Sequence, residues 1–227
     1  MAREPQIVGL GGHGETPEQT MALMGHVASL TGTSRPRVLH VATAMGDSAE
    51  YLLPFYERWT QLGEPSHVRF FPYPPPGLRE LVLSQDAISV GGGNTANMLA
   101  IWRLHGFDRI LREAWESGVL LFGGSAGMIC WFEAGVTDSF GPQLEGMECL
   151  GFLAGSACPH YDGEERRRPR YQELVANGLA EGIAAEDGVG LHYVGTELHE
   201  IVTCRPGAAA YRVRRDGEER LEARLLG

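Results

Sequence analysis

A serine flanked by small residues gives the strongest chemical signal in the sequence. Ser125 lies in Gly123-Gly124-Ser125-Ala126-Gly127, directly after the apolar run 119–122. A Gly-x-Ser-x-Gly turn between a strand and a helix holds its serine in a strained backbone conformation and exposes the hydroxyl. The pattern therefore predicts a nucleophilic serine. The simpler alternative is a small-residue turn in which Ser125 only caps the helix that follows.

A second glycine-rich turn, Gly91-Gly92-Gly93-Asn94, follows the apolar run 87–90. Adjacent parallel strands would bring both turns to the same carboxyl edge of a sheet. A backbone N–H of Gly92 or Gly93, together with that of Ala126, would then form a two-donor oxyanion hole. Asn94 is a natural N-cap for the next helix and a candidate substrate-binding residue. A phosphate loop is less favoured, because the turn has neither a G-x-G-x-x-G fingerprint nor a Walker lysine.

A serine nucleophile needs a base, and eight histidines compete for that role. His160 stands out because it follows the strand-like segment 152–158 and Pro159 and opens a polar loop, where functional side chains concentrate. His13, in the glycine-rich loop after the first strand, is the second choice. The others fall on predicted helices or in and beside strands, or have no comparable position: His26, His40, His67, His105, His192 and His199.

Spacing along the chain does not identify the acid that would orient the base. Six carboxylates lie in turn-like contexts: Glu133, Asp138, Glu145, Glu148, Asp162 and Asp187. The basic run 166–170 follows His160 closely, so that one of its arginines is a candidate anion-binding group. Metal binding and a thiol mechanism are less favoured, because no paired Cys/His spacing occurs and Cys130 falls inside a predicted apolar helix.

Composition excludes several partners. The chain has 19 Lys+Arg against 29 Asp+Glu, a formal net charge of -10, which repels nucleic acid and anionic membrane surfaces. No apolar run reaches the roughly 18 residues that a membrane-spanning helix needs. The four cysteines form no C-x-x-C pair, and this usage favours a reducing, cytoplasmic location.

The first half of the chain is predicted to form βα units, which would position these residues. Short apolar runs alternate there with amphipathic segments, the pattern of a parallel sheet covered by helices. Thr16-Pro17 with Gln19 predicts a capped helix start. After Trp131 the pieces become shorter and are expected to form antiparallel or edge strands. The expected strands of the first half are 6–10, 37–42, 68–71, 87–90 and 119–122, and the whole chain, 1–227, is expected to form one α/β domain.

These motifs together resemble peptidase E, the aspartyl dipeptidase family of serine peptidases, which is related to cyanophycinase. The resemblance rests on the glycine-rich segment 90–95, the serine turn 123–127 and Pro159-His160, and it extends over nearly the whole chain. It implies a mostly parallel sheet flanked by helices on both faces, flavodoxin-like or class I glutamine amidotransferase-like, with Ser125 as nucleophile and His160 as base. It also implies Asp138 as the acid, with Asp187 as an alternative. Glu133, one of the six carboxylates in turn-like contexts, is a further alternative.

The resemblance further implies an activity. Members of the dipeptidase type cleave dipeptides with an N-terminal aspartate, and Arg166 in Gly163-Glu164-Glu165-Arg166 matches the arginine expected to bind the aspartyl carboxylate. The expected chemistry is acyl transfer to a small peptide substrate, with no metal or organic cofactor. The alternatives are a related amidase, an isoaspartyl or cyanophycin-dipeptide hydrolase, and a noncatalytic protein that binds small anions on the same scaffold. A homodimer is compatible with the sequence.

Overall fold

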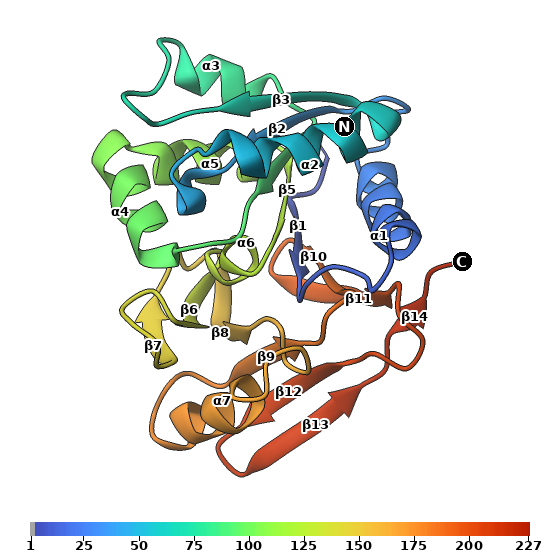
Figure 1. Ribbon diagram of the computed structural model, residues 1–227, viewed down its shortest axis with the longest axis vertical. Coiled ribbons are helices and arrows are strands. Elements are labelled where there is room, and N and C mark those ends of the chain that lie inside the picture. The colour runs from blue at the N-terminus through green and yellow to red at the C-terminus, as the bar shows by residue number, and fades with distance from the viewer. Residues whose placement is uncertain (1–2) are drawn as a thin grey trace.

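Residues 3–227, which the computed structural model describes, form two β-sheets with helices packed around them (Figure 1). The helices are α1 (Pro17–Leu30), the 3-10 helix η1 (Thr43–Met45), α2 (Ala49–Leu62), α3 (Leu78–Leu83), α4 (Thr95–His105), α5 (Phe107–Glu116), α6 (Ala126–Ile129) and α7 (Arg167–Ala176). The strands are β1 (Gln6–Leu10), β2 (Arg37–Val41), β3 (Glu64–Val68), β4 (Ala87–Val90), β5 (Leu120–Gly124), β6 (Phe132–Thr137), β7 (Glu145–Glu148), β8 (Leu153–Cys158), β9 (Gly182–Ala185), β10 (Val189–Val194), β11 (Glu197–Thr203), β12 (Ala210–Arg214), β13 (Gly217–Leu221) and β14 (Arg224–Leu225).

The larger sheet has the order β14-β11-β10-β1-β5-β4-β2-β3. The pairings β1–β5, β5–β4, β4–β2 and β2–β3 are parallel, whereas β10 pairs antiparallel with both β1 and β11. A buried parallel strand needs apolar side chains on both faces, which explains the continuous apolar runs at β4 and β5. The predicted class, an α/β fold with a mostly parallel sheet, is confirmed.

Helices cover both faces of this sheet. Val8 and Phe122 point to the face on which α1 and α2 pack, where they meet buried side chains such as Trp59. Ile7 and Leu121, one position away on the same strands, belong to the core that α4 and α5 cover. The period of two along each strand therefore distributes one apolar run between two cores.

The N-terminus of α1 is set by a capping box. Thr16 Oγ1 accepts a hydrogen bond from the Gln19 N–H at 3.2 Å, and Gln19 Oε1 accepts one from the Thr16 N–H at 3.3 Å. Pro17 occupies the first turn, where its missing N–H costs nothing. The predicted helix start is confirmed.

The third strand differs from the expected range 68–71. β3 runs from Glu64 to Val68 and pairs with β2 at the edge of the sheet, where Pro65 is tolerated because one side of the strand needs no partner. The apolar residues Phe70 and Phe71 leave the sheet because their N–H groups donate to the Asp47 carboxylate, the second of them at 3.0 Å.

Six strands from the second half of the chain form a second sheet, with the order β13-β12-β9-β8-β6-β7, while β10, β11 and β14 join the larger sheet. The second sheet lies below the first sheet in Figure 1, with α7 beside it. The sequence indicated short antiparallel or edge strands there, and the pairings of β12 and β7 are antiparallel, but β6, β8 and β9 pair in parallel. Of the strand-like stretches expected after Trp131, β10 and β11 pair antiparallel on the β1 side of the larger sheet, whereas β12 pairs antiparallel within the second sheet.

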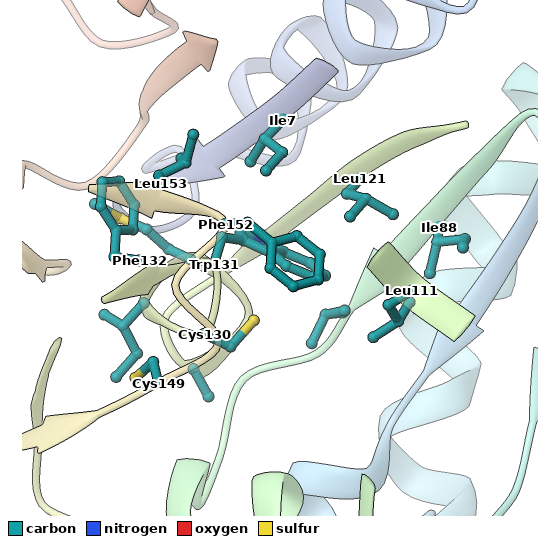
Figure 2. Close-up of a cluster of buried hydrophobic side chains, with 14 of the residues drawn as sticks. Ile7, Ile88, Leu111, Leu121, Cys130, Trp131, Phe132, Cys149, Phe152 and Leu153 are labelled. Carbon is teal, nitrogen blue, oxygen red and sulfur yellow. The ribbon is translucent and has the colours of Figure 1, made fainter. Parts of the chain in front are cut away.

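A cluster of aromatic side chains joins the two halves (Figure 2). The Trp131 and Phe152 ring centroids lie 5.7 Å apart, and Phe152 also stacks on Trp115 of α5 at 5.5 Å. Trp131 is fully buried directly after the serine turn, and it anchors the chain where it passes from the first sheet to β6 of the second. Buried aromatic pairs of this kind add about 1 kcal/mol each beyond their area burial.

No helix within residues 3–227 combines the length and apolar character needed to cross a membrane.

Candidate active site

Ser125 sits on a sharp turn between β5 and α6. Its backbone angles, φ 56° and ψ −118°, lie in a region that residues with side chains rarely adopt, and its hydroxyl makes no capping hydrogen bond to α6. Strain of this kind costs about 1–3 kcal/mol and persists where the surrounding fold imposes it. The helix that follows has only four residues, shorter than the sequence suggested. The serine hydroxyl is thus held outward and left free to react.

The glycines around Ser125 are required by close packing. A Cβ at Gly123 would stand 2.4 Å from the Val90 carbonyl oxygen, and one at Gly127 would stand 2.2 Å from the same atom. Real Cβ atoms do not approach an oxygen so closely, so that β5 and α6 can sit against β4 only with glycine at both positions. The Gly-x-Ser-x-Gly pattern therefore has a packing cause in addition to its chemical one.

The second glycine turn approaches Ser125, as the sequence predicted. A Cβ at Gly92 would lie 3.2 Å from the Ser125 Cβ. The flanking N–H groups are committed, because Gly91 donates to the Val41 carbonyl at 3.0 Å and Asn94 to that of Ala44 at 2.9 Å. Within residues 3–227, the N–H groups of Gly92, Gly93 and Ala126 have no such acceptor. Backbone donors are therefore available close to the serine.

His160 is fixed at the neighbouring strand end. The end of β1 pairs with the end of β5, with Leu10 opposite Gly124, and the His160 N–H donates to the Gly11 carbonyl at 2.9 Å. His160 has a φ of 52°, a second strained residue at this sheet edge. Its Nδ1 lies 2.7 Å from Asp187 Oδ1. An imidazole oriented by a carboxylate in this way has its Nε2 free for proton transfer.

The loop carrying Asp187, between β9 and β10, is held by other charged groups. The Asp187 N–H donates to Asp162 Oδ1 at 2.8 Å, and Arg205 donates to the Asp187 carbonyl at 2.8 Å while pairing with Asp162. Gly12 leaves space for the carboxylate, because a Cβ there would stand 1.8 Å from Asp187 Oδ1. Hydrogen bonds to the backbone N–H and carbonyl of Asp187, rather than to its carboxylate oxygens, thus fix the loop that positions the carboxylate.

The other two acids considered from the sequence lie elsewhere. Asp138 is exposed in the turn after β6, and within residues 3–227 no hydrogen bond or ion pair joins it to His160. Glu133 is exposed on β6 and accepts a hydrogen bond from the Gly155 N–H at 2.8 Å, within the second sheet. The carboxylate against His160 is therefore the alternative, Asp187, in place of Asp138, because the β9–β10 turn and not the β6–β7 turn reaches the end of β1.

The two expected substrate-binding residues are also placed differently. Asn94 uses both ends of its amide in the fold: Oδ1 accepts from the Asn97 N–H at 2.9 Å and Nδ2 donates to the Ser139 carbonyl at 3.0 Å. Its role as helix N-cap is confirmed, and both ends of its amide make hydrogen bonds within the fold. Arg166 is exposed next to α7 and lines a shallow hollow with Glu165 and Pro169, separate from the cavity at Ser125.

A cavity of about 260 Å³ opens beside Ser125, between the ends of the strands and helices α1 and α2. Its apolar wall comprises Leu10, Met24, Phe55, Trp59 and Phe122, and its polar groups include His13, His40, Arg58 and Ser89. The sequence reasoning did not single out Arg58 or assign a role to His40. A signal was present for Arg58, because positions 51, 55, 58 and 62 form one stripe of a helix and three of them carry large apolar side chains.

His13, the second choice of base, lies at the rim of this cavity and is exposed. Partial desolvation by the surrounding chain lowers the pKa of His13, and the neighbouring positive charges of Arg58 and His160 lower it further, while Asp187 opposes them. His13 therefore lies within electrostatic reach of the His160–Asp187 pair. Of the two histidines, His160 is the one that contacts the Asp187 carboxylate.

His40 is buried at the end of β2, stacked on Phe55 with ring centroids 4.4 Å apart. Its Nδ1 lies 3.0 Å from Ser89 Oγ. Burial lowers the pKa of His40 to about 4 from its ordinary value of 6.5, with smaller contributions from the charges of His67 and Arg58. The imidazole is therefore neutral at pH 7.

The depressed pKa of His40 predicts a loss of stability in acid. Because the folded protein binds this proton more weakly than the unfolded chain, protonation favours unfolding. The stabilising contribution is complete above about pH 6.5 and is lost as the pH falls toward 4, by about 2 kcal/mol between pH 7 and pH 5. Urea unfolding of the wild type and of His40→Gln at both pH values measures it: the wild type should lose about 2 kcal/mol more than the variant. Equal losses in the two proteins would contradict the burial argument.

Acyl transfer needs a nucleophile, a base and donors for an oxyanion, and the carboxyl edge of the larger sheet presents groups of all three kinds. The class of protein that this fold and this sheet edge define is the serine hydrolases.

Comparison with known proteins identifies the family. The model of peptidase family S51 matches residues 7–201, and the chain belongs to that family and is a serine hydrolase. It is 47% identical over 211 residues to the uncharacterized peptidase YgaJ of Bacillus subtilis (strain 168), which covers 92% of this chain and 91% of the relative. It is 27% identical over 129 residues to peptidase E of Pasteurella multocida (strain Pm70), with 52% of this chain and 55% of the relative covered.

A solved structure supports the fold. The crystal structure of a peptidase from an acI-B1 Actinobacterium superposes with a TM-score of 0.72 at 17% identity, covering 98% of this chain and 96% of the other. The overall fold is thus shared with a protein of low sequence identity. The predicted membership of the peptidase E group of serine peptidases is confirmed by the family match and by these relatives.

Proposed function

We propose that this protein hydrolyses short peptides, with Ser125 as nucleophile, His160 as general base and Asp187 as the acid that orients the base. The observation that carries the proposal is the 2.7 Å contact between His160 Nδ1 and Asp187 Oδ1, at the strand end next to the strained serine. The contact fixes the tautomer of His160, so that Nε2 is the nitrogen that receives the serine proton.

The reaction follows from these groups. His160 removes the proton of the Ser125 hydroxyl as its oxygen attacks the scissile carbonyl, and the resulting imidazolium protonates the leaving amine. Water, activated by the same histidine, then hydrolyses the acyl-enzyme. The N–H groups of Ala126 and of Gly92, where a Cβ would stand 3.2 Å from the Ser125 Cβ, are the proposed oxyanion donors, with Gly93 as the alternative. One such donor contributes about 10²- to 10³-fold in kcat.

The proposed substrates are dipeptides with an N-terminal aspartate. A cavity of about 260 Å³ lies just below the range of about 300–1,000 Å³ that is usual for sites binding drug-sized ligands, and so favours a substrate of one or two residues. Its polar lining includes Arg58 and His13, and no Asp or Glu of residues 3–227 lines it. Such a lining favours a negatively charged substrate. Arg166 lies outside the cavity and is not part of this proposal.

Hydrolysis of a matched panel tests the substrate. We expect kcat/KM for Asp-Leu to exceed that for Asn-Leu and Ala-Leu by about 10-fold or more, since a charged hydrogen bond contributes about 1.5–3 kcal/mol. Amine release would be followed for Asp-Leu, Glu-Leu, Asn-Leu, Ala-Leu and β-Asp-Leu. Preferential cleavage of β-Asp-Leu would move the assignment to an isoaspartyl hydrolase, and equal rates on Asp-Leu and Ala-Leu would reject acidic specificity.

We also propose that the enzyme acts in the cytoplasm. All four cysteines are buried and none forms a disulfide: Cys130, Cys149, Cys158 and Cys204. Unpaired structural thiols are typical of proteins kept in a reducing compartment.

A further inference from the structure

Arg58 is a cation without a countercharge. Thirteen arginine–carboxylate ion pairs occur among residues 3–227, and most of the arginines contribute to them, but Arg58 contributes to none and its guanidinium makes no hydrogen bond within those residues. It is partly buried on α2 and faces the cavity at Ser125, whose lining in residues 3–227 holds no carboxylate. Removing a charge from water without a partner is unfavourable, so an anion that entered this cavity would be bound by it.

His40 supplies a second polar group on the same wall. Only 7% of its surface is exposed, and its Nδ1 is occupied by Ser89. Its Nε2 lies on the side of Gly91, another residue of the cavity wall, 3.4 Å from where a Cβ would stand there. No hydrogen bond within residues 3–227 involves this nitrogen, and it is not one of the fully enclosed polar atoms that lack a partner, so it remains accessible from the cavity that His40 lines. A ligand group in the cavity can therefore form a hydrogen bond with it.

Arg58 and His40 line the same cavity. The positive charge of Arg58 influences both His40 and His13, which places the guanidinium within electrostatic reach of each. When the Ser89 hydroxyl donates to His40 Nδ1, the neutral imidazole carries its proton on Nε2 and becomes a donor toward the cavity. A guanidinium together with a neutral N–H donor suits a carboxylate, whereas the apolar side chains of Phe55 and Phe122 suit the carbon chain that bears it.

We propose that Arg58 and His40 form a carboxylate-binding subsite that selects the substrate of Ser125. The proposal rests on the peptidase activity proposed above. The carboxylate belongs either to the side chain of an acidic residue or to the C-terminus of a short peptide, and these two sources share the chemistry that the subsite recognises.

Steady-state kinetics of Arg58→Gln test whether the subsite exists and which carboxylate of the substrate it binds. The substrates are Asp-Leu, Asn-Leu and Asp-Leu amide, and kcat/KM for the substrates that carry the recognised carboxylate should fall about 10- to 100-fold, chiefly through KM. A loss on Asp-Leu and Asp-Leu amide with Asn-Leu spared identifies the side-chain carboxylate. A loss on Asp-Leu and Asn-Leu with the amide spared identifies the C-terminus. A uniform effect on all three substrates, or none, would overturn the proposal.

Matched variants separate this result from damage to the protein. Arg109→Gln removes an exposed arginine of α5, outside the cavity, and should leave all three substrates unchanged. Arg58→Lys keeps the charge and should retain part of the preference. If Arg166→Gln rather than Arg58→Gln removes the preference, the subsite has been assigned to the wrong arginine.

Two further readouts separate failure of the subsite from failure of the proposed activity. Arg58→Gln should react with phenylmethylsulfonyl fluoride, an uncharged serine reagent, at the wild-type rate; a wild-type protein that does not react would count against the peptidase proposal instead. Calorimetry in a Ser125→Ala background measures binding of Asp-Leu without turnover, and adding Arg58→Gln should weaken that binding about 10- to 100-fold. Unchanged affinity in the double variant would overturn the subsite whatever the kinetics show.

Discussion

Ser125→Ala is expected to lower kcat for dipeptide hydrolysis by about 10⁴- to 10⁶-fold, with little change in KM. Removing the nucleophile of a Ser-His-acid site eliminates the acyl-enzyme route, and only the contribution of substrate positioning and oxyanion donors remains. The fold should tolerate the change, because the Ser125 hydroxyl makes no hydrogen bond to α6 and the residue is not fully buried. Initial rates on Asp-Leu, with labelling by phenylmethylsulfonyl fluoride and the thermal midpoint of unfolding, measure all three expectations.

Ser84→Ala is the matched control. Ser84 follows α3 and its hydroxyl donates to the Leu81 carbonyl at 2.8 Å, away from the carboxyl edge of the sheet. That variant should keep wild-type turnover and wild-type labelling. Wild-type activity in Ser125→Ala would remove the nucleophile from the proposed mechanism. An inactive wild type that nevertheless binds dipeptides would favour a small-anion-binding protein on this scaffold.

The serine turn that carries the proposed nucleophile could be predicted from the sequence because everything that defines it is local. The apolar run of β5, the small residues at 123–127 and the turn into α6 lie within ten residues. The packing against Val90 that makes Gly123 and Gly127 necessary is also reflected directly in residue type. A strained serine turn is thus encoded in one continuous segment.

The proposed acid could not be chosen from the sequence in the same way, because the histidine that it contacts is distant in the chain. Asp187 meets His160 only because the β9–β10 turn, fixed by Asp162 and Arg205, reaches the end of β1. That arrangement depends on how the second sheet is joined to the first, and nothing in the spacing of carboxylates records it. Asp138 has an equally plausible local sequence, yet it lies in a turn of the second sheet.

The lining of the cavity could not be predicted from the sequence either, for the same reason. His40 lies on β2, Arg58 on α2 and Ser89 on β4, so these lining residues come from two βα units, β2–α2 and β4–α4. In the basic run near His160, Arg167 is buried against Glu164 and the Val136 carbonyl, and so serves the fold. The residue that the proposed subsite uses is Arg58, a single arginine on an otherwise apolar stripe of α2 that lines the cavity.

Asp187→Asn is expected to lower kcat by about 10³- to 10⁴-fold. An amide in place of the carboxylate can donate to His160 Nδ1, which favours the tautomer whose proton is on the wrong nitrogen, and it no longer stabilises the imidazolium. The loop itself should be preserved, because Asp162 and Arg205 contact the backbone N–H and carbonyl of Asp187 and not its carboxylate. Initial rates on Asp-Leu and the far-ultraviolet circular dichroism spectrum measure the two effects separately.

Asp138→Asn is the matched variant that distinguishes the two candidate acids, Asp138 and Asp187. The two substitutions remove the same charge, and only Asp187 lies 2.7 Å from His160. We therefore expect Asp138→Asn to retain kcat within about 3-fold, the range typical of an exposed residue away from the reacting groups. If Asp138→Asn were the inactive protein and Asp187→Asn the active one, the β6–β7 turn would have to approach the end of β1 during turnover. The contact in the structure would then describe a resting arrangement of His160 rather than the one that performs catalysis.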